Sequence, residues 1–219
     1  MSISLAAGLD AGLEALALDL SPAQRQALLD YLALLQKWNQ VYNLTAVRDP
    51  QAMLSHHLLD CLAVVAPLRA QLAALAMTAP IRLLDVGSGA GLPGLVLAIC
   101  LPQLQVDCVD TVAKKASFIQ QAALSLGLAN LRGLHARVER LTAAYHVVSA
   151  RAFSSLPDLV AGSDKALLPG GLWMAMKGKT PDEEIQALPQ QAQVFHVEPL
   201  QVPGLDAQRC IVWMRRASH

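Results

Sequence analysis

The residues best suited to chemistry form a dense glycine turn at positions 83–94, which read Leu-Leu-Asp-Val-Gly-Ser-Gly-Ala-Gly-Leu-Pro-Gly. A short apolar run ends at Val86, and Gly87, Gly89 and Gly91 follow at alternate positions before an apolar segment. Glycines let backbone N–H groups approach a ligand, and the N-terminus of a helix favours negative charge. The turn therefore predicts a nucleotide-type cofactor site.

Two registers of this turn favour different cofactors. Residues 89–94 match the GxGxxG string of a dinucleotide site, but that register begins past the strand end and puts Pro93 inside the turn. The tighter Gly87-x-Gly89-x-Gly91 register suits an adenosyl ligand with an amino-acid tail. Asp110, at the end of the next expected strand, can accept hydrogen bonds from both ribose hydroxyls and fits either class.

Two further interpretations of the glycines agree less well with the sequence. Gly178-Lys179-Thr180 resembles the end of a P-loop, but Trp173 stands where that motif needs its first glycine. In a purely structural interpretation the glycines only form a tight turn between strand and helix. The glycine density exceeds what such a turn needs.

The pattern of the chain predicts helices first and an α/β sheet afterwards. Ser21 and Asp49, each followed by proline, are typical N-caps of helices. A Thr180–Glu183 capping box predicts a later helix. Strands are expected at 81–86, 106–109, 131–134, 147–150, 172–176, 194–200 and 210–214. Helices are expected between the first five strands, at 93–101, 113–126, 139–144 and 156–168. Such alternation predicts a parallel, doubly wound sheet, and Pro203-Gly204 predicts an antiparallel hairpin at its end.

Composition sets broad limits on the protein. The chain has 219 residues, of which 54% are hydrophobic and 16% charged, so it can bury a large core. Its formal net charge is zero, which gives a nucleic-acid partner no electrostatic support. The four cysteines lack metal-ligand spacing and predict buried, reduced thiols, no metal and a cytoplasmic location. We expect no signal peptide and no membrane span.

The glycine turn continues directly into Leu92-Pro93-Gly94. Five further blocks stand out, namely Lys37–Thr45, Arg48–Pro50, His57–Asp60, Ala150–Phe153 and Met176–Lys179. In the turn and in these blocks the sequence resembles one family, the bacterial ribosomal small-subunit guanine-N7 methyltransferases, also called the glucose-inhibited division protein B family. The resemblance covers roughly residues 15–214. One departure is Tyr145-His146, where the family usually has phenylalanine and aspartate.

The resemblance implies a class I, Rossmann-like methyltransferase with a seven-stranded sheet, S-adenosylmethionine as cofactor and a guanine of 16S rRNA as acceptor. It implies a helical N-terminal extension over 1–75 and a cofactor-binding domain over 76–219. Family contacts fall on Gly87, Leu92, Val138, Glu139 and Arg151. With the residues of the turn, the cofactor candidates become Gly87, Ser88, Gly89, Gly91, Leu92, Asp110, Val138, Glu139 and Arg151.

The reaction so implied needs positioning more than proton transfer. Guanine N7 has a lone pair and no proton, so no general base is required. Arg151 is expected to bind either the cofactor carboxylate or guanine O6, the alternative being a surface ion pair. Lys177 is a second positioning candidate, as a phosphate contact. Asn43, Thr45, Arg48 and His57 are candidates for the RNA-facing mouth, although caps and buried hydrogen bonds explain such residues equally well.

Other functions remain open on the sequence alone. A small-molecule or protein methyltransferase would use the same fold, and the zero net charge is in its favour. A nicotinamide-dependent oxidoreductase would use residues 89–94. A non-catalytic binding module would keep the turn without turnover. We expect a monomer that acts on 16S rRNA within the small ribosomal subunit.

Overall fold

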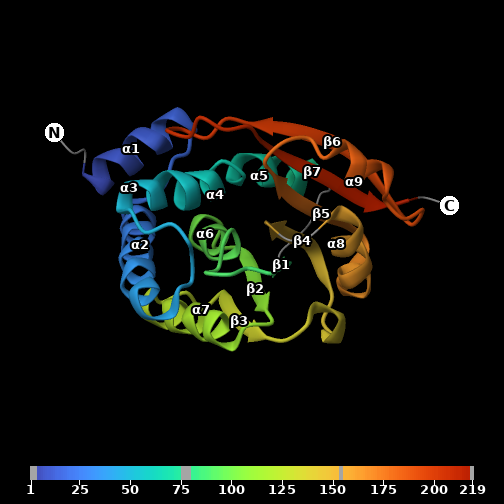
Figure 1. Ribbon diagram of the computed structural model, residues 1–219, viewed down its shortest axis with the longest axis horizontal. Helices are drawn as coiled ribbons and strands as arrows, with labels where there is room; N and C mark the ends of the chain where they lie inside the picture. The colour runs from blue at the N-terminus through green and yellow to red at the C-terminus, as the bar shows by residue number, and fades with distance from the viewer. Residues whose placement is uncertain (1–3, 75–79, 153–154, 218–219) are drawn as a thin grey trace.

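The computed structural model describes residues 4–74, 80–152 and 155–217 and shows one mixed sheet covered by helices on both faces (Figure 1). Its strands are β1 (Ile81–Val86), β2 (Leu104–Asp110), β3 (Leu131–His135), β4 (Tyr145–Arg151), β5 (Leu167–Lys177), β6 (Ala192–Leu200) and β7 (Arg209–Arg216). Their spatial order is β3-β2-β1-β4-β5-β7-β6. The expected α/β fold with its parallel, doubly wound centre is confirmed.

The register of the sheet brings the ends of the first strands together. β1 pairs in parallel with β2 and with β4, and Val86 lies between Val109 and Ala150. The residues that follow Val86, Val109 and Ala150 therefore meet at the carboxyl ends of these parallel strands. β7 runs antiparallel between β5 and β6, so the expected final hairpin is confirmed and its second strand is the inner one.

Helices precede the sheet, as the caps predicted. The extension contains α1 (Leu5–Ala15), α2 (Pro22–Tyr42), α3 (Pro50–Met53), α4 (Asp60–Leu62) and α5 (Val65–Ala74). Ser21 forms the predicted capping box with Gln24, and the Asp49 side chain accepts from the Ala52 N–H at 2.7 Å. Between α3 and α4 the helix widens into a π-helix, η1 (Leu54–Leu59), which the periodicity did not predict. The domain boundary expected at 75/76 lies outside the described residues.

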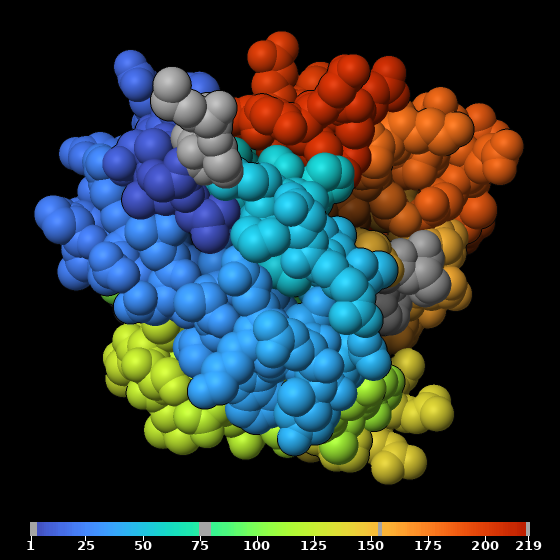
Figure 2. All heavy atoms as spheres, turned by 60° about the vertical axis from the view of Figure 1, so that its left-hand side comes forward, coloured from blue at the N-terminus to red at the C-terminus, as the bar shows by residue number. Residues whose placement is uncertain are grey.

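The two faces of the sheet bury separate clusters, because successive strand residues point to opposite sides. Leu83, Val147 and Trp213 face the cluster shared with the extension and with α6 (Gly94–Cys100) and α7 (Ala113–Ser125). Leu84 and Trp173 face the other cluster, under α8 (Leu156–Ser163). Figure 2 shows the extension, blue to cyan, as a continuous surface beside the C-terminal strands in red. The extension is thus part of the main core.

Three local expectations are wrong in detail. The helix after β5, α9 (Asp182–Gln186), has Pro181 as its N-cap and no side-chain cap, so the predicted box at Thr180 does not form. Its first turn carries three acids, which favour a helix N-terminus instead. The helix expected at 139–144 is a 3-10 turn, η2 (Val138–Arg140), and β5 begins at Leu167, inside the helix expected over 156–168.

One helical run, Pro50–Ala74, is long and apolar enough to cross a membrane by length and composition. Most of it is buried within the fold, as in the core helix of a soluble domain. Its apolar character is explained by packing, since Leu58, Leu62 and Leu68 are fully buried.

Candidate functional site

The glycine turn joins β1 to α6 at the edge where the strand ends meet. Gly87, Gly89 and Gly91 have φ values of 65°, 59° and 89°, which favour glycine. Asp110, at the end of β2, accepts hydrogen bonds from the N–H groups of Gly89 at 3.0 Å and Val112 at 2.9 Å. The carboxylate predicted to hold a ribose therefore also fixes the turn.

A pocket of about 330 Å³ opens beside this turn. Small-molecule sites begin at about this size. Its walls come from the ends of four strands, and four predicted residues line it: Gly87, Asp110, Val138 and Glu139. A Cβ added at Gly89 would meet no atom of the described residues within 4 Å, so the backbone there faces open space. These features fit an adenosyl ligand with its ribose near Asp110 and its base near Val138.

The remaining turn residues lie beneath the pocket. Ser88, Gly91 and Leu92 are buried, and an added Cβ at Gly91 would lie 3.1 Å from the Leu95 Cβ. At Gly94 it would lie 2.5 Å from the Cys108 Sγ, so Gly94 allows α6 to pack on the sheet. Ser88, Gly91 and Leu92 thus shape the turn from inside, whereas Gly87 lines the pocket and Gly89 borders open space.

Asp85 anchors the turn from below and is fully buried. Its Oδ2 accepts from the Gly94 N–H at 2.9 Å, and its Oδ1 accepts from the Ser149 hydroxyl at 3.0 Å. Burial raises the pKa of Asp85 to about 7, while these two hydrogen bonds act in the opposite direction. The sequence shows this aspartate, but its anchoring role depends on Ser149 in a neighbouring strand.

The helical extension holds the same turn from above. The buried Tyr31 of α2 donates its hydroxyl to the Ala90 carbonyl at 3.0 Å. Gln24 donates to the Ile99 carbonyl at 2.8 Å, at the end of α6. The sequence does not predict this contact, because the helical spacing of Tyr31 only places it on the buried face of α2.

Arg151, at the end of β4, reaches into the extension. Its Nη1 donates to the Asp60 carboxylate and to the His56 carbonyl, each at 3.0 Å. The other oxygen of Asp60 accepts from Arg209 Nε at 2.9 Å. Asp60 is buried and the Arg151 side chain is 20% exposed, so this is not a surface ion pair. Arg209 was not predicted, and Phe153 of the same sequence block lies outside the described residues.

The four residues expected at the RNA-facing mouth divide into two kinds. Asn43 and Arg48 are exposed and joined by a 2.8 Å hydrogen bond. His57 is buried, and its Nε2 lies 2.7 Å from Thr45 Oγ1. Burial and then the Arg151 charge lower the pKa of His57, and both effects favour the neutral imidazole. Thr45 and His57 thus support the loop that presents Asn43 and Arg48.

Lys177, the other positioning candidate, ends β5 next to β4. Its Nζ lies 2.7 Å from Glu184 Oε2, and this glutamate also accepts from the Leu156 N–H. Lys177 and Gly178-Lys179-Thr180 line a separate hollow of about 440 Å³. The departure at Tyr145-His146 lies at the opposite end of β4, where His146 accepts from the Arg82 N–H at 3.0 Å.

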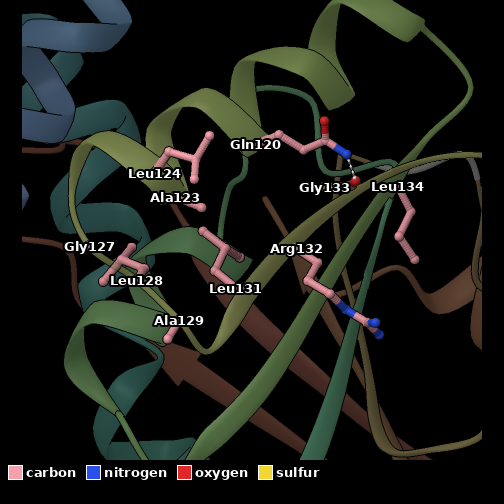
Figure 3. A pocket seen from close by; sticks show the side chains of 10 residues that line it. All are labelled: Gln120, Ala123, Leu124, Gly127, Leu128, Ala129, Leu131, Arg132, Gly133 and Leu134. Atoms are coloured by element: carbon pink, nitrogen blue, oxygen red, sulfur yellow. Dashed lines mark hydrogen bonds between the residues drawn. The ribbon is translucent and has the colours of Figure 1, made fainter.

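A larger hollow of about 590 Å³ lies at the outer edge of the sheet, between α7 and β3 (Figure 3). Its walls are mainly apolar, with Leu124, Leu128 and Leu131 among them, and Gln120 donates to the Gly133 carbonyl at 2.9 Å. It lacks the glycine turn and carboxylate that mark the smaller pocket. The smaller pocket is therefore the candidate cofactor site.

The strand order and the site define the class of protein. A dinucleotide-binding sheet runs 3-2-1-4-5-6, whereas here an antiparallel β7 separates β5 from β6. With a Gly87-x-Gly89-x-Gly91 turn at the end of β1, this is the class I fold of S-adenosylmethionine-dependent methyltransferases. The same topology argues against the oxidoreductase alternative.

Comparison with known proteins identifies the family. The profile of the GidB family, described as rRNA small subunit methyltransferase G, matches residues 24–212, and the chain belongs to this family. A relative from Paracidovorax citrulli (strain AAC00-1), named Ribosomal RNA small subunit methyltransferase G, is 65% identical over 219 residues, covering 97% of this chain and 90% of the relative. A relative of the same name from Acidovorax ebreus (strain TPSY) is 63% identical over 216 residues, covering 97% of this chain and 96% of the relative.

Two solved structures share the fold at low sequence identity. TrmN from Thermus thermophilus aligns with a TM-score of 0.57 at 22% identity, covering 75% of this chain and 53% of that one. The ribosomal protein L11 methylase from Lactobacillus delbrueckii subsp. bulgaricus aligns with a TM-score of 0.54 at 15% identity, covering 78% and 80%. The chain thus belongs to the rRNA small subunit methyltransferase G family and has the class I methyltransferase fold.

Proposed function

We propose that this chain transfers the methyl group of S-adenosylmethionine to N7 of a guanine in 16S rRNA. The observation that carries the proposal is the junction at the end of β4, where Arg151 binds Asp60 of the extension beside the cofactor turn. Membership of the family supports it, since the matched residues include both parts of this junction. The relatives' shared name supports rRNA of the small subunit as the substrate class.

The residues of the site would act by binding and alignment. S-adenosylmethionine supplies an electrophilic methyl group when bound. Asp110 would accept from the ribose hydroxyls, Val138 and Glu139 would contact the adenine, and the N–H groups around Gly87 would approach the amino-acid tail. N7 of guanine attacks through a lone pair, so no group of this site has to remove a proton before transfer. Holding the two reactants in line supplies most of the rate.

The acceptor side would be formed jointly by the sheet and the extension. Arg151 and Lys177 stand at the ends of neighbouring strands, where they would hold the cofactor tail and an RNA phosphate. Asn43 and Arg48 would contact the RNA from the loop after α2, which Thr45 and His57 hold in place. We propose the corresponding division of the chain into a helical extension over residues 1–75, packed on the core, and a cofactor-binding domain over residues 76–219.

The proposed setting is the bacterial cytoplasm, with the protein acting as a monomer on 16S rRNA within the small ribosomal subunit.

The test is incubation of purified protein with isotope-labelled S-adenosylmethionine and small ribosomal subunits that lack the modification, followed by mass spectrometry of the rRNA nucleosides. The expected product is labelled 7-methylguanosine at one position. Naked 16S rRNA in a parallel reaction shows whether the assembled particle is needed. Label in another nucleoside, or in a ribosomal protein, would contradict the proposed acceptor.

A further inference from the structure

One buried carboxylate of the extension lies between two arginines of the sheet. Asp60 Oδ2 is 3.0 Å from Arg151 Nη1, and Asp60 Oδ1 is 2.9 Å from Arg209 Nε. The Asp60 side chain is 4% exposed, and the arginines are 20% and 24% exposed. The three residues come from α4, the end of β4 and the start of β7, so the cluster forms only in the folded chain.

The carboxylate holds the two guanidinium groups through separate oxygens. Oδ2 pairs with Arg151 and Oδ1 with Arg209, so either contact can be removed without the other. Only the contact to Arg151 concerns the end of β4, which lies beside the glycine turn.

Arg151 has N–H donors left over for an anionic group of a ligand. Both of its hydrogen bonds use Nη1, and its Nε and Nη2 donate to none of the residues that the structure describes. A guanidinium fixed at one nitrogen presents its remaining N–H groups in a set plane, which suits a carboxylate. Asp60 therefore does more than pair with Arg151, because it determines where the free edge of the guanidinium points.

The register of the sheet shows which part of the cofactor this edge would meet. Val86 pairs with Ala150, so the next residues, Gly87 and Arg151, stand opposite each other at the strand ends. Gly87 and Ala152 both line the pocket, on either side of this position. The ribose and adenine candidates lie towards β2 and β3. The amino-acid tail of the cofactor is then on the β4 side, within the reach of Arg151.

We propose that Asp60 is a positioning residue, which orients Arg151 towards the carboxylate of the cofactor's amino-acid tail. The π-helical turn η1 supports this role, since it ends at Leu59 and its His56 carbonyl holds the same Nη1. π-Turns inside α-helices are frequent at functional sites. The inference rests on the proposed cofactor role of Arg151 and does not depend on which base or particle is methylated.

The test compares two ligands that differ only in the tail. S-adenosylhomocysteine carries the amino-acid carboxylate, and 5′-methylthioadenosine lacks it. Binding of both to the full chain is measured by calorimetry for the wild type, Asp60→Asn and Arg209→Met. Asparagine keeps the shape of Asp60 and removes its charge. Arg209→Met is the matched control, because it breaks the other half of the cluster and leaves the Arg151–Asp60 pair in place.

For Asp60→Asn we expect at least a tenfold loss of affinity for S-adenosylhomocysteine and less than a threefold change for 5′-methylthioadenosine. Arg209→Met should bind both ligands within threefold of the wild type. Its loss of melting temperature should be comparable to that of Asp60→Asn. Adding Arg151→Ala to Asp60→Asn should cost no more than Arg151→Ala alone. A parallel loss of both ligands in Asp60→Asn, or unchanged binding of S-adenosylhomocysteine, would overturn the inference. If S-adenosylhomocysteine binds normally but the rRNA assay fails, the proposed guanine acceptor would be overturned instead.

Discussion

Substituting Gly89 with alanine separates the ligand-facing role of the turn from its folding role. Gly89 has φ +59°, and an added Cβ there would enter space free of described atoms. Gly127, just past the end of α7, has φ +66° and the same free space. Gly89→Ala and Gly127→Ala therefore impose the same backbone strain, but only the first places a methyl group beside the proposed cofactor.

The expected stability losses follow from the backbone alone. A left-handed conformation costs an L-residue about 1 kcal/mol or somewhat more, with no clash to add at either position. For a chain of this size that lowers the melting temperature by about 2–4 °C. The cofactor loses its close backbone approach only in Gly89→Ala, where we expect an affinity loss of at least about tenfold, or 1.4 kcal/mol.

Calorimetry with S-adenosylhomocysteine and thermal unfolding of the free protein measure the two effects separately. We expect similar melting temperatures for both variants and weakened binding only for Gly89→Ala. Equal affinities in two folded variants would refute this expectation, because the turn would then not approach the cofactor.

Three further outcomes are expected. Asp110→Ala should weaken S-adenosylmethionine binding by about 1–3 kcal/mol in calorimetry, and an unchanged dissociation constant would place the ribose elsewhere. Arg151→Ala should weaken binding while the protein stays folded, but intact binding with lost turnover on small subunits would assign Arg151 to the guanine. The pKa of Asp85 is raised to about 7 in the folded chain against about 4 unfolded, so its contribution to stability falls by about 4 kcal/mol as pH rises between these values. Asp85→Asn, whose amide can serve Gly94 and Ser149, should flatten the pH dependence of the denaturant-measured stability between pH 4 and 7, and an unchanged slope would count against a protonated Asp85.

Local sequence was sufficient wherever local interactions decide the structure. Ser21 and Asp49 cap their helices as predicted, because a cap needs only the first turn of its own helix. β1 occupies the predicted residues, since its apolar run and the following glycines fix both ends. At Thr180 the same reasoning failed, because the first turn of α9 and the contact of Glu184 with Lys177 place that helix instead.

The meeting of the residues that line the candidate cofactor pocket could also be predicted from the sequence. Gly87 and Asp110 end neighbouring parallel strands, so their meeting follows from the alternation of strands and helices. The positions of Val138 and Glu139 beside them follow in the same way from the end of β3. The spacing of residues could not show that Asp110 also binds the Gly89 N–H, because that depends on the side-chain rotamer.

The sequence by itself thus determined the class of fold, the turn and the carboxylate beside it, because each depends on residues close in the chain or on parallel strand order. Only the tertiary structure decided that β7 lies between β5 and β6, that Tyr31 holds the turn, and that Asp60 joins Arg151 to Arg209. These contacts join residues far apart in sequence. Their side chains meet only after the extension has packed on the sheet, and no periodicity or motif encodes that meeting.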